Sequence, residues 1–293
     1  MSGNRGDGPI TIEQLTESHR FDEDLAALLT RFQYQEDGIN LTAAEPRPLP
    51  SVAYTASTAG LDAVFAESES LVFVTYDDRG HQMVNPVESA LIRAIVGAVS
   101  TASVLPQPDG GQAASVGDAP AVTDTSSDSS GSDQSGGGID DVASTSTSNP
   151  PSLGVVTPHN AQRGALETVL PDTVTSNTVE KYQGGERDIV AVCGTVSDPA
   201  FARKEEQFIL NPNRLLVAIS RSRLLTIVVC SDALFEVAPR TRDNIDNGPV
   251  WARLFTETVG ENPDPTWAGS LTSFTGEESD EYSTVPVTVY TNS

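Results

Sequence analysis

A glycine-rich turn and an arginine at a helix end are the residues of this chain best suited to phosphate chemistry. The turn, Gln-Gly-Gly-Glu, occupies residues 183–186 and lies between two strand-like runs. A helix-like pattern over residues 212–222 follows it and carries Arg221 near its end. Glycine lets the backbone approach a ligand closely, and a guanidinium presents a planar fork of donors that fits phosphate oxygens. A purely structural role for Arg221 stays open, because an arginine at a helix end often interacts only with the helix dipole and a nearby carboxylate.

Alternating strand and helix patterns must position these residues. Strands of nearly continuous apolar character are expected at 71–76, 153–157, 174–179, 188–195 and 224–230. Helix patterns are expected at 22–32, 85–99, 161–170 and 212–222. The second helix opens on Asn85 as its cap and Pro86 in its first turn. Apolar strands that alternate with helices favour a parallel sheet covered on both faces, so the predicted fold class is α/β.

One low-complexity block interrupts this pattern. It is rich in Gly, Ser, Asp and Thr and has almost no bulky apolar side chains. Such a segment buries too little apolar surface to offset the entropy cost of ordering. The predicted organisation is a disordered N-terminus at 1–10, one domain formed by 11–104 and 151–257, a disordered insertion at 105–150, and an acidic C-terminal tail at 258–293. The tail contains one strand-like run, residues 285–290.

The balance of charges is strongly acidic. The chain has 17 Lys and Arg residues against 41 Asp and Glu, which gives a formal net charge of -24. Surface carboxylates keep a protein hydrated in a cytoplasm of very high salt. Their mutual repulsion is screened there, because the Debye length falls to about 3 Å at 1 M. The composition therefore favours a halophilic archaeon as the source, with an ordinary acidic protein as the alternative. The charge weighs against nucleic-acid binding, although at high salt local arginines still make short contacts.

Other features of the sequence argue against several classes of protein. No apolar run reaches the roughly 18–20 residues needed to cross a bilayer, and the polar N-terminus does not resemble a signal peptide. Cys193 and Cys230 lie in apolar strand-like runs, which favours buried reduced thiols over a disulfide or metal site. His81 and His159 are interpreted as solvated loop residues. We therefore expect a cytoplasmic protein with no metal site and no membrane contact.

The glycine-rich turn and its surroundings resemble motif V of superfamily 1 helicases. The common form of that motif is Thr-Val-Asp-x-x-Gln-Gly-x-Glu-x-Asp. Its places are filled here by Thr178, Val179, Gln183, Gly184, Glu186 and Asp188. The resemblance is to the branch that includes the nonsense-mediated-decay helicases and their DNA-replication relatives.

Four further segments resemble elements of the same family in the same order. Residues 15–21 are similar to the Leu-x-x-x-Tyr-Arg element, with Arg20 on its arginine, and residues 85–90 are similar to the Asn-x-x-Glu-Ala helix start. Residues 155–162 are similar to Thr-Pro-Tyr-Arg-Ala-Gln, and residues 211–223 to motif VI, Arg-Leu-Asn-Val-Ala-x-Thr-Arg-Ala-Lys. The positions that depart from the family residues are His19, His159, Asn160, Leu216 and Ser220.

The resemblance implies a second RecA-like domain, which borders the nucleotide of a helicase motor. Phosphoryl transfer depends on positioning and on positive charge near the γ-phosphate oxygens. By the resemblance, Arg221 is the arginine finger and Arg20 a second γ-phosphate sensor. Gln183, Gly184 and Glu186 are the expected nucleotide-binding residues of the turn.

The resemblance also implies partners. Thr157 and Thr178, at strand ends, are expected to contact the backbone of single-stranded DNA or RNA. No Gly-x-x-x-x-Gly-Lys-Ser/Thr loop occurs in the sequence, and no Asp-Glu pair follows a strand in the manner of Walker B. ATP with Mg²⁺ is therefore expected to be bound mainly by a first RecA-like domain on another polypeptide. This chain is not expected to hydrolyse ATP alone.

Three hypotheses remain open at this point. The first is the second motor domain of a helicase, favoured by Arg20, Glu186 and Arg221. The second is a non-catalytic interaction or regulatory module derived from that domain, favoured by the departures at His159, Asn160 and Leu216. The third is a decaying gene fragment. A neighbouring reading frame with a Gly-Lys-Ser/Thr loop would discriminate between them.

Overall fold

The computed structural model describes residues 17–18, 23–34, 38–43, 54–65, 70–102, 151–182, 185–242, 245–278 and 281–291. The chain divides into one unit formed by Met1–Val104 with Pro150–Ser293 and a second unit, Leu105–Asn149. All described residues belong to the first unit. The segments predicted to be disordered, 1–10 and 105–150, lie outside the described residues.

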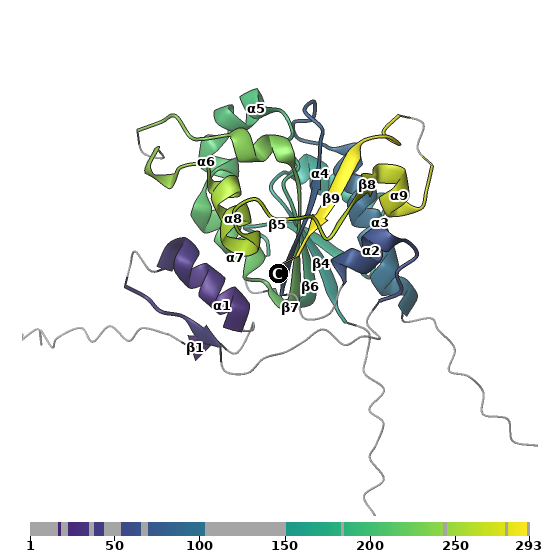
Figure 1. The fold of residues 1–293 in the computed structure, drawn as a ribbon, viewed down its shortest axis with the longest axis horizontal. Coiled ribbons are helices and arrows are strands. Elements are labelled where there is room, and N and C mark those ends of the chain that lie inside the picture. The colour runs from purple at the N-terminus through teal and green to yellow at the C-terminus, as the bar shows by residue number, and fades with distance from the viewer. Residues whose placement is uncertain are drawn as a thin grey trace, which may run out of the picture. The chain divides into compact units, whose positions relative to one another are not determined.

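A seven-stranded sheet with the order β5-β4-β6-β7-β3-β9-β8 forms the centre of the first unit (Figure 1). Its strands are β3 (Leu71–Tyr76), β4 (Leu153–Thr157), β5 (Thr175–Thr178), β6 (Arg187–Cys193), β7 (Ser222–Ser231), β8 (Trp267–Ser270) and β9 (Pro286–Tyr290). The strands β3 to β7 are parallel, whereas β9 is antiparallel to β3 and β8 is antiparallel to β9. The predicted α/β fold with a largely parallel sheet is confirmed.

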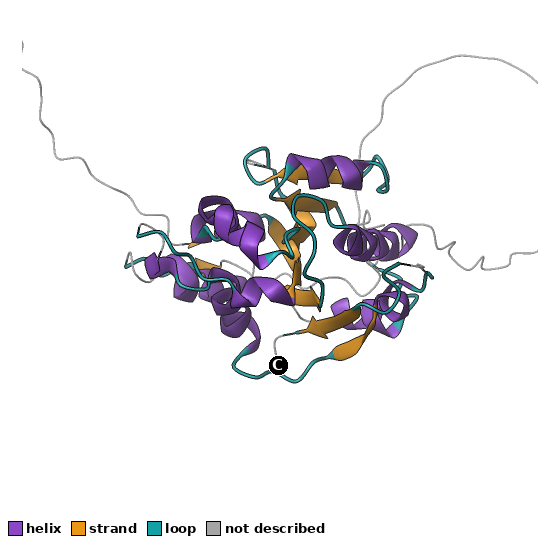
Figure 2. Cartoon of the chain, turned by 90° about the horizontal axis from the view of Figure 1, so that it is seen from above, coloured by secondary structure: helices purple, strands orange, loops and turns teal. Residues whose placement is uncertain are grey.

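Helices cover both faces of this sheet (Figure 2). One face packs against α2 (Ala59–Val64), α3 (Pro86–Ala102), α4 (Asn160–Glu167) and α9 (Leu271–Thr275). The other packs against α1 (Glu23–Leu29), α5 (Pro199–Lys204), α6 (Glu206–Ile209), α7 (Pro212–Ile219) and α8 (Val250–Val259). Short turns of other helix types are η1 (Thr30–Tyr34), η2 (Asp232–Glu236) and η3 (Ile245–Asn247), and β1 (Glu17–Ser18) pairs with β2 (Thr42–Ala43).

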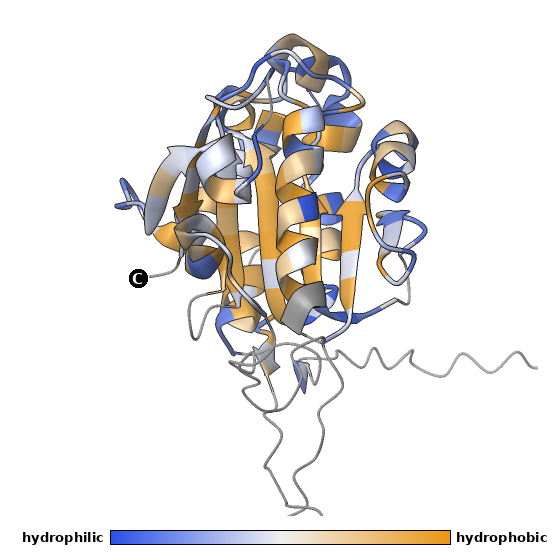
Figure 3. Cartoon of the chain, turned by 90° about the vertical axis from the view of Figure 1, so that its right-hand side faces the viewer, coloured by the Kyte–Doolittle hydropathy of each residue, from blue (hydrophilic) through white to orange (hydrophobic). Residues whose placement is uncertain are grey.

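The local sequence explains why these elements form where they do. Every residue of β3 is buried, and its side chains alternate between the two cores, with Val72 and Val74 on one face and Phe73 on the other. The strands accordingly form an apolar layer beneath the helices (Figure 3). The helix α7 begins after Asn211, whose Oδ1 accepts hydrogen bonds from the second and third residues of the helix at 3.0 and 3.3 Å. This cap satisfies backbone donors that the first turn leaves unpaired.

The C-terminal part of the chain differs from the acidic tail expected at 258–293. Residues 267–290 contain β8, α9 and β9, and the strand-like run at 285–290 pairs with β3 through Val74 and Val289. Phe274 of α9 and Val287 of β9 are completely buried. A few apolar side chains therefore join this segment to the core, while its described carboxylates, Glu261, Asp264, Glu277, Glu278 and Glu281, are exposed.

Candidate functional site

The amino ends of β6 and β7 bring two predicted site residues to the same edge of the sheet. Glu186 directly precedes β6, and Arg221 directly precedes β7. The backbone N–H of Arg187 donates to the carbonyl oxygen of Arg221 at 3.2 Å, so the two strands begin side by side. The side chains of Glu186 and Arg221 are both half-buried. We call the group formed by Ser152, Glu186, Arg187, Asp188, Arg221 and Arg223 the amino edge.

Arg223 forms ion pairs with both carboxylates of the amino edge. Its Nε lies 3.3 Å from Oε2 of Glu186, and its Nη1 lies 4.0 Å from Oδ1 of Asp188. Asp188 in turn accepts hydrogen bonds from the backbone N–H and hydroxyl of Ser152 at 2.8 and 2.7 Å. The starts of β4, β6 and β7 are thereby connected through side chains.

Arg223 is not among the site residues predicted from the sequence. The available signal was spacing, because Arg221 and Arg223 alternate at one strand start while Glu186 and Asp188 alternate at another. That signal becomes informative only once β6 and β7 are known to be neighbours.

Three of the predicted site residues lie outside the described residues. These are Arg20, Gln183 and Gly184. Their roles as a γ-phosphate sensor and as nucleotide-binding residues stay predictions.

Thr157 and Thr178 end two neighbouring strands at the opposite edge. They are Cα partners in the parallel pairing of β4 with β5. Both side chains are buried, and the Oγ1 of Thr157 lies 3.3 Å from the Oγ1 of Thr195. Their hydroxyls therefore do not face solvent in this arrangement, and their contact with nucleic acid stays a prediction.

A buried carboxylate, Glu88, is at the centre of this opposite edge. The backbone N–H of Thr195 donates to both carboxylate oxygens at 3.0 and 2.8 Å, and the hydroxyl of Tyr76 donates to Oε2 at 3.1 Å. Burial raises the pKa of Glu88 to about 7, although these hydrogen bonds act in the opposite direction. Burial also raises the pKa of Cys193, whose thiol is hydrogen-bonded to Glu88. We call the group of Tyr76, Asn85, Glu88, Thr157, Gln162, Cys193 and Thr195 the carboxyl edge.

The carboxyl edge connects three loops through neutral side chains. The Oε1 of Gln162 accepts a hydrogen bond from the backbone N–H of Asn85 at 2.9 Å, and the Nδ2 of Asn85 donates to the carbonyl oxygen of Thr195 at 3.1 Å. Thr195 has a φ of 62°, a left-handed conformation that is strained for a β-branched residue. Strain of this kind persists only where surrounding contacts determine the backbone, and here Glu88 and Asn85 supply such contacts.

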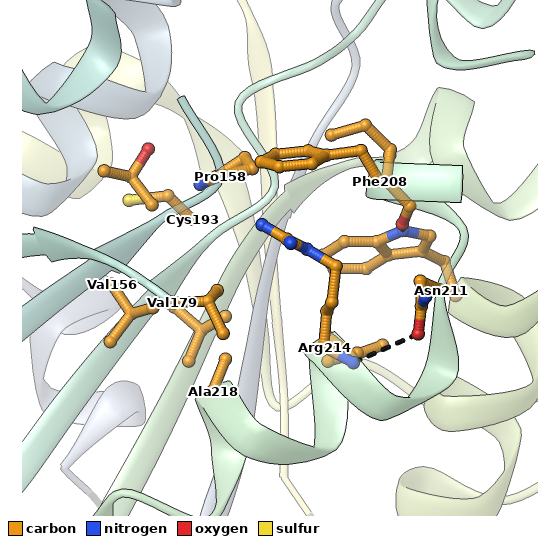
Figure 4. Close-up of a pocket in the computed structure, with 13 residues that line it drawn as sticks. Val156, Pro158, Val179, Cys193, Phe208, Asn211, Arg214 and Ala218 are labelled. Atoms are coloured by element: carbon orange, nitrogen blue, oxygen red, sulfur yellow. Dashed lines mark hydrogen bonds between the residues drawn. The ribbon is translucent and has the colours of Figure 1, made fainter. Parts of the chain in front are cut away.

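A pocket opens beside the carboxyl edge, between β4 and β6. The chain leaves β4 for β5 on one side and leaves β6 for β7 on the other, although β4 and β6 are neighbours. In open α/β sheets such a reversal creates a crevice outside the carboxyl ends of the strands, and ligands bind there. The pocket is small, with room for ≈ 30 Å³, about one water molecule, and residues from both strand ends line it (Figure 4).

The outer wall of this pocket combines an aromatic ring with an arginine. The Cζ of Arg214 lies 3.6 Å from the centroid of the Phe208 ring, and Arg214 also forms an ion pair with Glu180. The ring of His159 stacks on Phe208 with centroids 5.4 Å apart. Burial lowers the pKa of His159, which favours its neutral form. The prediction that His159 is a solvated loop residue is wrong, because the aromatic ring of Phe208 shields it.

The described residues contain no group of three or more His, Cys, Asp or Glu side chains placed to hold a metal ion. The amino edge instead offers guanidinium groups, which fit phosphate oxygens. Within the same described ranges, no helix has the length and apolar character that crossing a bilayer requires.

Comparison with known proteins finds similarity over part of the chain. A family model named AAA_12, described as an AAA domain, matches residues 139–233. An uncharacterised ATP-dependent helicase of Caenorhabditis elegans is 33% identical over 82 residues, which cover 28% of this chain and 5% of the helicase. The chain thus corresponds to a small part of that relative. The segment that carries β4 to β7 is thus similar to an AAA domain and distantly similar to part of an ATP-dependent helicase.

Proposed function

We propose that this chain supplies the second RecA-like motor domain of a superfamily 1 ATP-dependent DNA or RNA helicase, formed by residues 11–104 and 151–257, with β8, α9 and β9 extending its sheet. The observation that carries the proposal is the meeting of Glu186 and Arg221 at the amino edge, held by adjoining strand starts. Both belong to segments that resemble helicase motifs V and VI, and the AAA match spans both segments.

Arg221 acts on the transferred phosphoryl group in this proposal. Bound ATP with Mg²⁺ supplies that group and is held mainly by a first RecA-like domain. Arg221 places positive charge where the γ-phosphate oxygens gain negative charge, and its planar fork keeps two donors in fixed geometry. In this proposal Glu186 lies on the same nucleotide-facing side, while Arg223 fixes the direction of the Glu186 carboxylate. Arg20, Gln183 and Gly184 complete the nucleotide side.

The carboxyl ends of β4 and β5 form part of the nucleic-acid track. Because the side chains of Thr157 and Thr178 are buried, their contribution is to hold backbone amide groups that meet the strand. The formal charge of -24 supports a cytoplasm of very high salt, where screening leaves only such short local contacts effective.

A reconstitution experiment tests this function. The purified chain is mixed with a polypeptide that carries the Walker A and Walker B motifs of a related helicase, and ATP turnover is measured with and without single-stranded nucleic acid. Turnover that appears only in the mixture and rises with nucleic acid supports the proposal. A chain that binds the first domain without any turnover supports the alternative, a non-catalytic interaction or regulatory module.

A further inference from the structure

A groove of ≈ 690 Å³ lies between the helix α1 and the segment that leads into β2. Ala27 of α1 and Thr30 at the start of η1 line one side of it, and residues 38–43 line the other. Its volume falls within the roughly 300–1,000 Å³ range of binding pockets. We call it the α1 groove, and it is large enough to admit several side chains of a partner.

The helix α1 has one face in the core and the opposite face in the groove. Leu25 and Leu28 are buried in the core, whereas Ala27 and Thr30 are half-buried and line the groove. The Oγ1 of Thr30 accepts a hydrogen bond from the backbone N–H of Leu41 at 3.0 Å. This bond joins the two walls, so the groove is part of the folded arrangement of these elements.

The lining of the α1 groove is divided between apolar and polar side chains by exposure. The apolar side chains are half-buried, namely Ala27, Ile39, Leu41 and Ala43. The charged side chains are exposed, namely Glu23 and Arg31. An apolar centre within an exposed polar rim is the usual composition of a protein–protein interface.

The α1 groove lies on the side of the sheet where the parallel strands begin. Leu28 of α1 and Leu71 at the start of β3 line the same small gap. Leu71 is the Cα partner of Thr226 in β7, and Arg221 directly precedes β7. Arg20, the predicted second γ-phosphate sensor, precedes α1 by three residues in the sequence. The groove therefore flanks the side that the proposed function turns toward ATP.

Position and charge select the occupant of the groove. The first RecA-like domain must approach this side to bring ATP to Arg221. A nucleic-acid strand offers phosphates, but the one cationic side chain among the described lining residues, Arg31, already pairs with Glu257. A second copy of this chain would bring another net charge of -24 to the same surface.

We propose that the α1 groove receives a segment of the first RecA-like domain, with apolar side chains of that domain against Ala27 and Ile39. The proposal rests on the proposed function, because it identifies the surface that holds the ATP-binding partner. A first domain anchored there presents its nucleotide to Arg221. Ala27 and Ile39 are docking residues and take no part in phosphoryl transfer.

Filling the groove tests this docking surface. The full chain and its Ala27→Trp variant are titrated with the polypeptide that carries the Walker A and Walker B motifs, and both binding and ATP turnover are measured. Ala27→Trp is expected to weaken binding about tenfold or more, the loss typical of a contact at the centre of an interface. Turnover at saturating first domain should be unchanged, because Arg221 is intact.

The outcomes separate the docking proposal from the broader function. Wild-type affinity of Ala27→Trp in a mixture that turns over ATP would overturn the docking surface and leave the proposed function standing. A lower saturating turnover at wild-type affinity would also overturn it, because the groove would then act on the chemistry. Absence of both binding and turnover for the wild-type chain would contradict both proposals.

Ala165→Trp is the matched control, because Ala165 is also a half-buried helical alanine but lies on α4, which packs on the other face of the sheet. Equal loss of affinity in the two variants would overturn the proposal. So would a much lower unfolding midpoint for Ala27→Trp alone, which would show that this chain fills its own groove. A wild-type dimer in sedimentation that Ala27→Trp dissociates would assign the groove to a second copy instead.

Ile39→Ala tests the same surface by removing apolar contact rather than filling space. Ile39 is half-buried and lies outside the two cores, so the variant is expected to fold. Its affinity for the first domain should fall about fivefold or more. Wild-type affinity of this variant would contradict the role assigned to Ile39, whether or not Ala27→Trp folds.

Discussion

At the carboxyl edge a glutamate is completely buried among neutral donors, whereas at the amino edge the side chain of Glu186 is 28% exposed and faces an arginine. Glu88 accepts from a backbone N–H and a hydroxyl and has no ion pair among the described residues. Glu186 pairs with Arg223, whose own side chain is 45% exposed. The contrast indicates that the carboxyl edge is fixed by folding, whereas the charges of the amino edge remain accessible to a ligand.

The largest effect on stability is expected at the carboxyl edge. Glu88→Ala removes the acceptor of the Thr195 N–H and the Tyr76 hydroxyl and leaves a cavity. Unsatisfied buried donors and a cavity together cost about 3 kcal/mol or more. Urea unfolding at constant pH measures this loss, with Glu167→Ala on the exposed face of α4 as the control. A loss for Glu88→Ala as small as that for Glu167→Ala would contradict the assigned role.

The buried Glu88 should also make the stability of the protein depend on pH. Burial raises the pKa of Glu88 from 4.5 to about 7, so between these values the folded state binds the proton more tightly than the unfolded state. The contribution of Glu88 is therefore fully present below pH 4.5 and is lost as the pH rises through about 7, by on the order of 3 kcal/mol. Glu88→Gln cannot titrate and serves as the reference. The difference in unfolding free energy between the two proteins should fall across this range, and a constant difference would refute the burial argument.

A small effect on stability is expected at the amino edge. Arg223→Gln breaks ion pairs to Glu186 and Asp188, but all three side chains are partly exposed. Such pairs contribute about 0–1 kcal/mol, so the unfolding free energy should change by less than about 1 kcal/mol. In the reconstituted motor the same variant should lower turnover, because the Glu186 carboxylate loses its fixed direction. A large loss of stability in thermal or urea unfolding would make the amino edge a structural element like the carboxyl edge.

Most strands of the parallel sheet could be predicted from the sequence. The strands β3, β4, β6 and β7 are continuous apolar runs, and such runs alternating with helices indicate a parallel sheet. The segment containing α9 and β8 could not be recognised, because its elements have only 5 and 4 residues and bury few side chains. Periodicity gives too weak a signal over such lengths.

In the candidate site, too, some residues could be predicted from the sequence and others could not. The motif resemblances predict Glu186 and Arg221 as site residues, but the position of Arg223 beside them follows from the pairing of β6 with β7, which local sequence does not encode. Glu88 looks like an ordinary acidic residue in the first turn of a helix. Its burial depends on the loop at Thr195, which is distant in sequence. Phe208 and His159 likewise meet only through the packing of α6 on the end of β4.

The central claim is that Arg221 acts on the phosphoryl group rather than on the fold. The direct measurement is ATP turnover of the reconstituted motor with Arg221→Ala, alongside the unfolding free energy of the same variant. Arg163→Ala on α4 is the control for the removal of a partly buried arginine.

An arginine finger contributes on the order of a thousandfold or more to turnover. We therefore expect Arg221→Ala to lose about that factor while its unfolding free energy changes by less than about 1 kcal/mol, as for substitutions outside the core. Arg221→Lys should restore little, because an ammonium cannot reproduce the planar fork. Full turnover of Arg221→Ala, or a loss of turnover that merely follows unfolding, would contradict the claim.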